Sequence, residues 1–197
     1  MYSETWNWEK CKRKIRMLKG RLGFPEAPVL KFLGLSLSLE DGRIHDDLRH
    51  FFYSRIEPSV YCILSGYTDA QLMPESPRLV SFAQLWGGRS YQSAFAQRVI
   101  KPVENVFGSK VSRLHQAAKL LGDKKLAHGD CSVKIYSLPL VPITIILWAE
   151  TSEFPASANI LFNSIANNYL STEQLAMLSE LTSARLRYAY EVSITES

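Results

Sequence analysis

The segment from Leu138 to Leu170 constrains the fold more than any other part of the sequence. Its residues 143–148 read Ile-Thr-Ile-Ile-Leu-Trp, a β-branched and aromatic run that is too short to span a membrane. We therefore predict a buried strand there. Pro139 and Pro142 limit where the ladder of this strand begins, because proline has no N–H to donate. Residues 160–162 are a candidate for a further short strand.

The predicted strand has a partner nearby in the sequence. Residues 132–136 form a second predicted strand, and the proline-bearing connection between the two is too short for a parallel crossover. The strands must therefore pair antiparallel. Ser171 and Gln174 form a capping-box pattern that begins a closing helix over residues 172–190. We expect this helix to cover one face of the sheet.

The first half of the chain contributes a hairpin and a helix. Residues 33–39 place leucine at every second position, which is typical of a strand with one buried face. Asp41-Gly42 is a tight-turn pair and predicts a hairpin. Pro58 can begin a helix that stops at Gly66.

Two more helices are predicted between residues 88 and 122. The first carries Pro102, which should kink or split it. Its inward-facing residues are predicted to be Tyr91, Phe95, Val99 and Val106. Ser109 can cap the second helix, and Gly122 ends it. The order of elements is helix, hairpin, helices, strands, helix, which indicates an α+β fold in which an antiparallel sheet packs with helices.

The composition indicates a single compact domain with a basic N-terminal helix. Of the 197 residues, 46% are hydrophobic, which is enough to bury a core. Residues 1–24 are the basic amphipathic segment, with a helix predicted over 4–22, and residues 25–197 are the α+β domain. The mild net charge of +4 is concentrated in that helix. Its apolar face is formed by Trp8, Cys11, Ile15, Leu18 and Leu22.

The basic helix admits three interpretations. Its tryptophans and lysines fit attachment to a membrane surface. Its charge fits nucleic acid, but no recognised nucleic-acid-binding motif accompanies it, so we do not expect nucleic acid to be the partner. Its apolar stripe fits docking on the protein's own core or on an acidic partner protein, and we take this as the default.

The cysteines and the hydropathy indicate a cytoplasmic protein. Cys11, Cys62 and Cys131 are isolated from one another, and one of the three must remain without a disulfide partner. This pattern favours a reducing compartment. No run approaches the roughly 20 apolar residues of a transmembrane helix, and the N-terminus has no apolar signal segment.

The second half of the sequence carries short motifs in a definite order. They are Val80-Ser81-Phe82, Gly87-Gly88, Tyr91, Phe95, Gly129-Asp130, Leu138-Pro139, Val141-Pro142, Glu153-Phe154-Pro155-Ala156, Ile160-Leu161-Phe162, Tyr169-Leu170 and Thr172-Glu173. Through these motifs, residues 80–182 resemble the bacterial and archaeal family known as domain of unknown function 3786. The hairpin near residues 33–44 fits that family more loosely.

The resemblance implies a context, not a reaction. By this resemblance, the members of the family look like proteins of anaerobes, and they are often labelled iron–sulfur proteins. Some members carry an N-terminal four-cysteine cluster domain similar to that of corrinoid iron–sulfur proteins. This chain departs from that pattern, because its cysteines are isolated and a four-iron cluster usually needs four thiolates. We therefore expect no iron–sulfur cluster within the chain. The acidic residues that the family often has before Glu153 are also fewer here.

Three residues are candidates for metal binding. His128 and Cys131 are three positions apart, but they lack a second ligand pair at the spacing of a zinc site. A strand-entry turn in which Asp130 bonds backbone N–H groups accounts for the same segment. His115 could be an axial ligand to the metal of a tetrapyrrole, either a cobamide or haem; the more common alternative is a hydrogen-bonded histidine at the edge of the core.

Further candidates for ligand binding lie on glycine turns. Gly87, Gly88 and Arg89 could hold an anion at the start of a helix, and we include Tyr91 in the same group. The alternative is a glycine turn that allows Trp86 to pack.

Charged residues near the ends of two elements complete the set of candidates. Glu150 and Glu153 flank a turn, where they could be an acid–base pair or carboxylates that accept bonds from turn N–H groups. Arg185 lies within the apolar arc of the closing helix. There it could pair with a buried carboxylate or contact an anionic ligand, but we favour extension of its side chain to the helix margin. We expect the loops 85–91, 129–130 and 150–156 to converge on one side of the sheet.

No set of residues identifies a hydrolase, because the chain has neither a nucleophile elbow nor a recognisable Ser or Cys paired with His and an acid. We expect a non-enzymatic accessory protein of anaerobic metabolism that binds a ligand or a partner protein. A link to corrinoid or iron–sulfur one-carbon chemistry is implied by the resemblance alone. The alternative is a small enzyme that acts on a tetrapyrrole or another cofactor through Glu150, Glu153 or Asp130.

Overall fold

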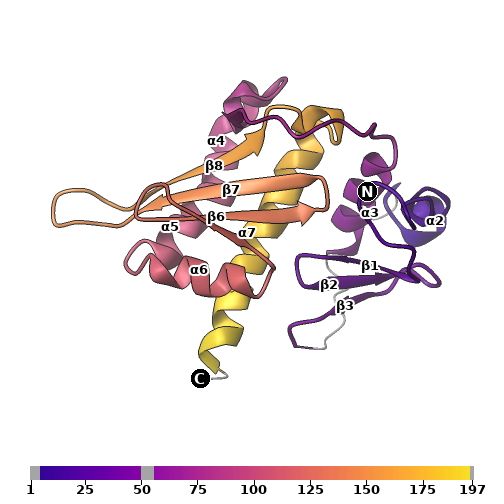
Figure 1. Ribbon diagram of the computed structural model, residues 1–197, viewed down its shortest axis with the longest axis horizontal. Helices are drawn as coiled ribbons and strands as arrows, with labels where there is room; N and C mark the ends of the chain where they lie inside the picture. Colours follow the sequence, from indigo (N-terminus) through magenta and orange to yellow (C-terminus); the bar gives the residue numbers. More distant parts are fainter. Residues whose placement is uncertain (1–4, 50–55, 196–197) are drawn as a thin grey trace.

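The computed structural model describes residues 5–49 and 56–195, and its architecture is the predicted α+β fold (Figure 1). The helices are α2 (Trp8–Arg16), α3 (Glu57–Tyr67), α4 (Gln92–Phe95), α5 (Lys101–Phe107), α6 (Ser112–Lys119) and α7 (Thr172–Thr195). The strands are β1 (Val29–Phe32), β2 (Leu35–Ser38), β3 (Ile44–Asp46), β4 (Leu79–Ser81), β5 (Lys124–Leu126), β6 (Cys131–Leu138), β7 (Val141–Trp148) and β8 (Ser157–Asn163). Among the described residues, no helix is both long and apolar enough to cross a membrane.

Five antiparallel strands form the larger sheet, in the order β4-β8-β7-β6-β5. Two residues, 139 and 140, connect β6 to β7, and the two strands pair antiparallel with Ser132 opposite Ile146. This pairing confirms the prediction. The candidate strand at residues 160–162 is part of β8, which pairs with β7. The edge strands β4 and β5 were not predicted, because three residues are too few to show an alternating pattern.

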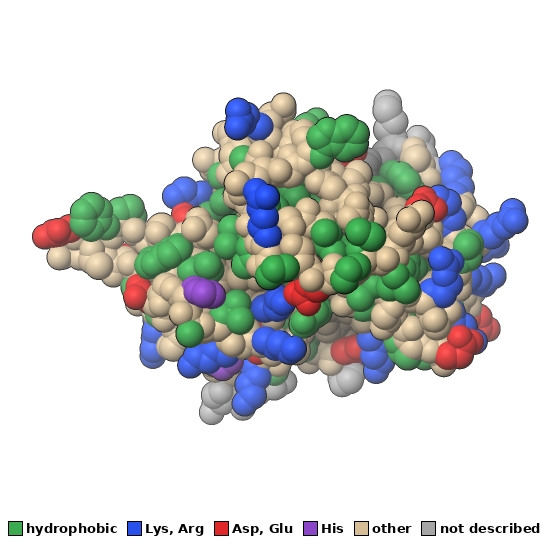
Figure 2. Space-filling model, turned by 45° about the horizontal axis from the view of Figure 1, so that its top comes forward, with side chains coloured by type: hydrophobic (Ala, Val, Ile, Leu, Met, Phe, Trp, Pro, Cys, Tyr) green, Lys and Arg blue, Asp and Glu red, His purple; other side chains and the backbone are tan. Residues whose placement is uncertain are grey.

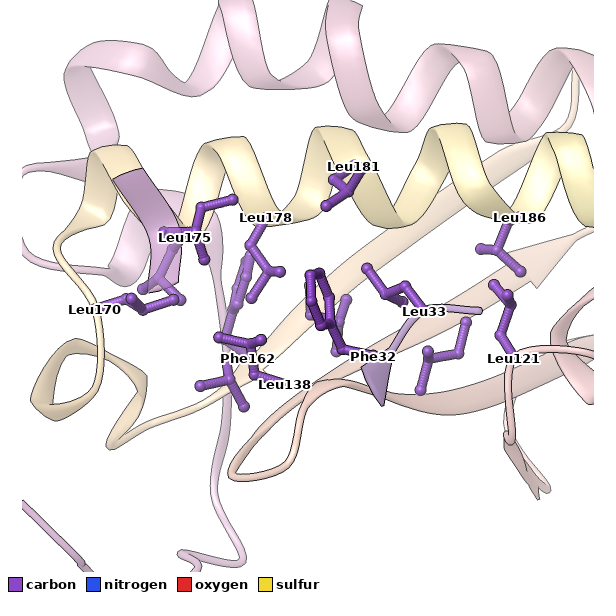
Figure 3. Packing of buried hydrophobic residues seen from close by; sticks show 14 of the residues in the cluster. Phe32, Leu33, Leu121, Leu138, Phe162, Leu170, Leu175, Leu178, Leu181 and Leu186 are labelled. Atoms are coloured by element: carbon purple, nitrogen blue, oxygen red, sulfur yellow. The ribbon is translucent and has the colours of Figure 1, made fainter. Parts of the chain in front are cut away.

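The closing helix α7 covers one face of this sheet, as predicted, and α5 and α6 lie on the same face (Figure 1). Leu178 and Leu186 project from α7 into the layer that contains Phe162 of β8, and all three side chains are fully buried (Figure 3). The capping box that begins α7 is also confirmed. The N–H of Gln174 donates to Ser171 Oγ (3.2 Å), and the N–H of Ser171 donates to Gln174 Oε1 (3.1 Å).

β1, β2 and β3 form a smaller antiparallel sheet beside α2 and α3 (Figure 1). The hairpin predicted at Asp41-Gly42 is confirmed, since β2 and β3 pair antiparallel. The single strand predicted over residues 33–39 is too long, because Leu33 and Gly34 form the turn between β1 and β2. Both residues have positive φ, 51° and 67°. A two-residue hairpin turn of type I′ requires positive φ at both of its central residues.

The basic N-terminal helix is part of the core. α2 is shorter than predicted, because residues 17–23 form turns in which Gly20 and Gly23 have positive φ. The apolar face belongs to the same hydrophobic cluster as the sheets through Cys11, Ile15, Leu18 and Leu22. Its charges are also engaged within the protein: Lys12 pairs with Glu9, Lys14 with Asp69, and Arg16 donates to the carbonyls of Leu39 and Glu40. The default interpretation, docking on the protein's own core, is what the structure shows.

The segment from residue 88 to 107 is helical but interrupted. A π-helical turn lies directly before α5, whose second residue is Pro102. The predicted disruption at Pro102 takes the form of this π-helical turn and not of a break, because the chain stays helical from Gln92 to Phe107. Phe95 is buried as predicted, and its ring stacks on Phe82 with 4.0 Å between ring centroids. Tyr91 is 67% exposed, so the prediction that it faces inward is wrong; it lies in the 3-10 turn that precedes α4.

Arg185 links α7 to the small sheet. Its side chain is buried and donates to the carbonyls of Leu33 (2.9 Å) and Gly34 (3.0 Å) and to Asp46 Oδ1 (2.7 Å). The favoured prediction, extension to the helix margin, is wrong because a buried carboxylate and two turn carbonyls lie within reach of the guanidinium. Burial alone would raise the pKa of Asp46, but hydrogen bonds from Arg185, from Tyr188 and from a backbone N–H hold that pKa below its ordinary value.

We predict that Asp46→Asn lowers the free energy of unfolding at pH 7 by about 3–5 kcal/mol, because it leaves the buried Arg185 guanidinium without its counter-charge. Urea denaturation followed by circular dichroism measures the change. Asp47→Asn is the matched control: Asp47 is exposed and bonds Ser36 and His45, so its loss should cost less than about 1 kcal/mol.

The decrease in the free energy of unfolding caused by Asp46→Asn should also depend on pH. The folded-state pKa of Asp46 lies below its unfolded value, so its stabilising effect is present at neutral pH and disappears as pH falls through the folded-state pKa. The difference between wild type and Asp46→Asn should therefore narrow in acid. A difference that stays constant or widens as pH falls would contradict this assignment.

Candidate functional site

A pocket between α6 and the strands β5 and β6 contains the three candidate metal ligands predicted from the sequence, together with Asp130. Its volume is about 500 Å³. Its lining residues are Val111, Ser112, His115, Lys125, Leu126, Ala127, His128, Gly129, Asp130 and Cys131. The fold thus brings His115, from one helix, to the turn that carries His128 and Cys131.

The local sequence explains why His115 faces this pocket. On α6, Leu114 and Ala118 are fully buried, and His115 follows on the adjacent, half-open side of the helix. α6 begins at Ser112 without the predicted cap from Ser109. The chain then reverses at Gly122, which has positive φ as the predicted helix end requires.

His115 forms a pair with Asp123, the residue that follows this turn. His115 Nδ1 lies 3.0 Å from Asp123 Oδ2, and the carboxylate side chain is only 4% exposed, whereas the imidazole is 37% exposed. A carboxylate can only accept, so Nδ1 carries the hydrogen, and in the neutral imidazole the other ring nitrogen, Nε2, is then an acceptor. This is the arrangement found around metal-binding histidines, in which a carboxylate fixes the tautomer and the ring orientation.

The His128–Cys131 turn has a structural explanation. Asp130 Oδ2 accepts a hydrogen bond from the N–H of Ala149 (2.8 Å), as expected for a strand-entry turn. Gly129 has positive φ, and a Cβ there would lie 2.9 Å from the side chain of Ile146. Burial raises the pKa of the Cys131 thiol, so the thiol is protonated at neutral pH and is a poor metal ligand. In residues 5–49 and 56–195, no three His, Cys, Asp or Glu side chains are grouped to hold a metal ion.

The glycine turn at residues 86–91 lies on the surface, with Gly88 as its one buried residue. The N–H of Trp86 donates to Asn167 Oδ1 (3.0 Å), and its carbonyl accepts from Thr172 Oγ1 (2.6 Å). Its side chain nevertheless remains 89% exposed, so the interpretation that the turn allows it to pack is wrong. Gly87 has positive φ, and a Cβ at Gly88 would collide with the carbonyl oxygen of Phe82.

Two further predicted residues of this turn are also placed on the surface. Arg89 and Tyr91 lie in the 3-10 turn of four residues that precedes α4, and both are exposed. So short a helical turn has little dipole with which to hold an anion. Trp86, Arg89 and Tyr91 are all exposed, so the predicted anion site is an aromatic and basic surface. Figure 2 shows that hydrophobic and basic side chains are both exposed on the face that it views.

The three loops predicted to converge do not meet. Residues 129–130 contact the end of β7 through the Asp130–Ala149 hydrogen bond. The loop 150–156 extends beyond that end of the sheet, at the left of Figure 1, with both Glu150 and Glu153 exposed. Residues 85–91 instead lie against the start of α7, at the top of the same view. The prediction failed because β4 ends opposite Leu161, short of the β7–β8 turn, and Trp86 then bonds Asn167 and Thr172 beside the start of α7.

Other predicted residues have structural positions. Arg185 binds backbone carbonyls and Asp46, as described above. Cys11, Cys62 and Cys131 are all buried, on α2, α3 and β6 respectively. The sequence analysis did not identify Asp123 as a site residue. The pattern that indicates it is an acidic residue directly after Gly122, where the helix ends, eight residues after His115.

Comparisons with curated proteins and with solved structures find no match. A family described as domain of unknown function (DUF3786) matches residues 28–185. The match confirms the resemblance seen in the sequence and extends it toward the N-terminus, to the small sheet and α3. It also includes the whole of the pocket with His115 and Asp123. The chain therefore belongs to the DUF3786 family.

Proposed function

We propose that this protein is a non-enzymatic binding protein that holds a metal-bearing cofactor through His115. The observation that carries the proposal is the Asp123–His115 pair at the edge of a 500 Å³ pocket. The carboxylate holds the imidazole in one orientation, so Nε2 is available to a ligand without the cost of ordering the ring.

The lining of the pocket fits a cofactor that brings its own metal. The protein offers one oriented imidazole there and no group of three ligating side chains within the described residues, which suits an axial ligand better than a complete metal cage. Val111, Leu126 and Ala127 supply apolar walls, and Lys125 supplies a cation for an acidic substituent. A cobamide or a haem combines these features, and the bound group would supply the metal-centred chemistry.

The enzymatic alternative has less support. Glu150 and Glu153 are exposed on the loop beyond the sheet, and neither lines the His115 pocket. One carboxylate oxygen of Asp130 already accepts a hydrogen bond from the backbone N–H of Ala149. Cys131 is a buried thiol whose pKa is raised by that burial, so it is not an activated nucleophile.

The wider setting is also part of the proposal. The family resemblance supports a role in anaerobic metabolism, linked to corrinoid or iron–sulfur-dependent one-carbon chemistry. Three isolated, buried cysteines support a reducing, cytoplasmic setting. An iron–sulfur cluster does not fit the residues, because the cysteines lie on three different elements.

We predict that His115→Ala abolishes binding of haemin or hydroxocobalamin, whichever the wild type binds, because it removes the axial imidazole. Asp123→Asn should weaken binding by about 10- to 100-fold, since it releases the tautomer and orientation of His115. Absorption titrations with each cofactor measure both effects, because exchange of the axial ligand shifts the visible bands.

His45→Ala is the matched control, since His45 also contacts a carboxylate, that of Asp47 at 3.3 Å, but lies on the small sheet. It should bind as the wild type does. The proposal fails if the wild type binds neither cofactor, or if His115→Ala and His45→Ala bind equally well.

We also predict that anaerobic reconstitution of the protein with iron and sulfide yields no stoichiometric cluster. The buried cysteines on α2, α3 and β6 cannot provide four thiolates to one cluster. Iron counting and the absorption near 400 nm, where iron–sulfur clusters absorb, measure the result. One cluster per chain would contradict this part of the account.

A further inference from the structure

The most exposed aromatic side chains of the described chain lie on two surface loops. Phe154, at the tip of the β7–β8 hairpin, is 68% exposed, and Trp86 and Tyr91 are exposed on the turn before α4. Neither loop lines the His115 pocket. Aromatic residues are enriched at protein–protein interfaces, so both loops are candidate contact surfaces.

The tip of the hairpin is acidic and is held in place by hydrogen bonds. Residues 149–156 contain two acids, Glu150 and Glu153, and no basic residue. The N–H of Thr151 donates to the Phe154 carbonyl (2.9 Å), and Thr151 Oγ1 accepts from the N–H of Phe154 (3.0 Å). A contact with a partner therefore costs little further ordering of the loop. The loop projects beyond the body at the left of Figure 1, and Figure 2 shows hydrophobic and acidic side chains at its end.

The turn at residues 85–91, which we call the Trp86 turn, has the complementary charge. It contains one basic residue, Arg89, and no acid. The exposed side chain of Arg89 forms no ion pair or hydrogen bond in the part of the chain that the structure describes, and the same holds for both acids of the hairpin tip. Each surface therefore combines an exposed aromatic group with a charge that has no partner.

The two surfaces do not meet within one chain. The Trp86 turn lies beside the start of α7, where Thr172 bonds the Trp86 carbonyl. β4, which precedes this turn, pairs with one end of β8, whereas the hairpin tip precedes Ser157 at the other end. A contact between the two surfaces therefore requires a second copy of the chain. When a two-fold axis exchanges two such patches, the contact forms twice and the assembly closes.

We propose that the protein forms a two-fold dimer in which the hairpin tip of each copy contacts the Trp86 turn of the other. Phe154 packs against Trp86 and Tyr91, and Glu153 pairs with Arg89 through charge-assisted hydrogen bonds. The dimer contains six of these aromatic side chains, and side chains of this kind bury about 150–250 Å² each. Together with the residues around them, they bring the interface to the roughly 1,200–2,000 Å² of specific, stable complexes.

Sedimentation velocity of the full chain across the micromolar concentration range tests the dimer. The wild type should sediment as a dimer at high concentration and dissociate reversibly on dilution. Phe154→Ala should weaken dimerisation by about tenfold or more, because truncation of a buried aromatic anchor is among the costliest changes at an interface. Ile194→Ala is the matched control; Ile194 is also apolar and exposed, but it lies in the last turn of α7, so the dimer should be unchanged.

A charge exchange tests which surfaces meet. Glu153→Arg and Arg89→Glu should each weaken dimerisation by about tenfold, because each change places like charges in contact. The double variant restores an opposite pair in the reverse sense, so it should recover most of the lost affinity. Glu191→Arg makes the same charge change at an exposed position near the C-terminus, and it should dimerise as the wild type does. Circular dichroism checks that each variant is folded.

The proposal is overturned if the wild type is monomeric throughout this range, or if it grows beyond the dimer, which would show an open head-to-tail contact. It is also overturned if Phe154→Ala dimerises as well as the wild type. A double variant as weak as the two single variants would show that the two surfaces do not contact each other. The measurements need no cofactor, so their outcome is independent of the His115 site.

Discussion

The hydrogen bonds of Arg185 are the interaction on which the arrangement of the two sheets depends. One guanidinium on α7 holds the carbonyls of Leu33 and Gly34 and the carboxylate of Asp46, all of which belong to the small sheet. Removing two charges from water costs several kcal/mol, so such a pair contributes more to geometry than to net stability. The apolar burial of α7 supplies the stability, and Arg185 fixes where the small sheet lies on it. The same bonds stabilise a turn in which Leu33 adopts an unfavourable positive φ.

This constraint extends to the candidate cofactor site. A Cβ at Gly34 would lie 3.1 Å from the Arg185 guanidinium and 3.4 Å from the side chain of Leu121, so the three residues are packed together. Leu121 stands two residues before Asp123 and one before the turn at Gly122. The turn that leads to Asp123 therefore lies beside the turn between β1 and β2, while α6 itself packs on α7 and β6. A change at the Arg185 contacts should reach the pocket through this turn.

Much of the fold could be predicted from the sequence, because its signals are local. The β6–β7 pairing follows from a connection of two residues, and the start of α7 follows from Ser171 and Gln174. The edge strands and the Leu33-Gly34 turn could not be predicted, since neither has a distinctive pattern. Arg185 was assigned to the helix margin because its acceptors lie about 140–150 residues away in the sequence.

The candidate site was predictable only in part. His115, His128 and Cys131 were each identified by residue type, but the packing of α6 on β6 that brings them to one pocket is a long-range property. The predicted convergence of three loops was wrong for the same reason, since residues 129–130 and 150–156 lie at one end of the sheet whereas residues 85–91 lie beside the start of α7. Exposed aromatic residues such as Trp86 cannot be distinguished from core residues by type alone.

The location of the bound cofactor is the most direct test of the central claim. Amide chemical shifts of the ¹⁵N-labelled protein can be measured with and without one equivalent of haemin or of hydroxocobalamin. The account predicts that the affected amides cluster at residues 111–115 and 123–131, while those of α2 and of residues 85–91 keep their positions. Changes confined to residues 85–91, or spread evenly over the surface, would contradict the assignment of His115 as the ligand-binding residue.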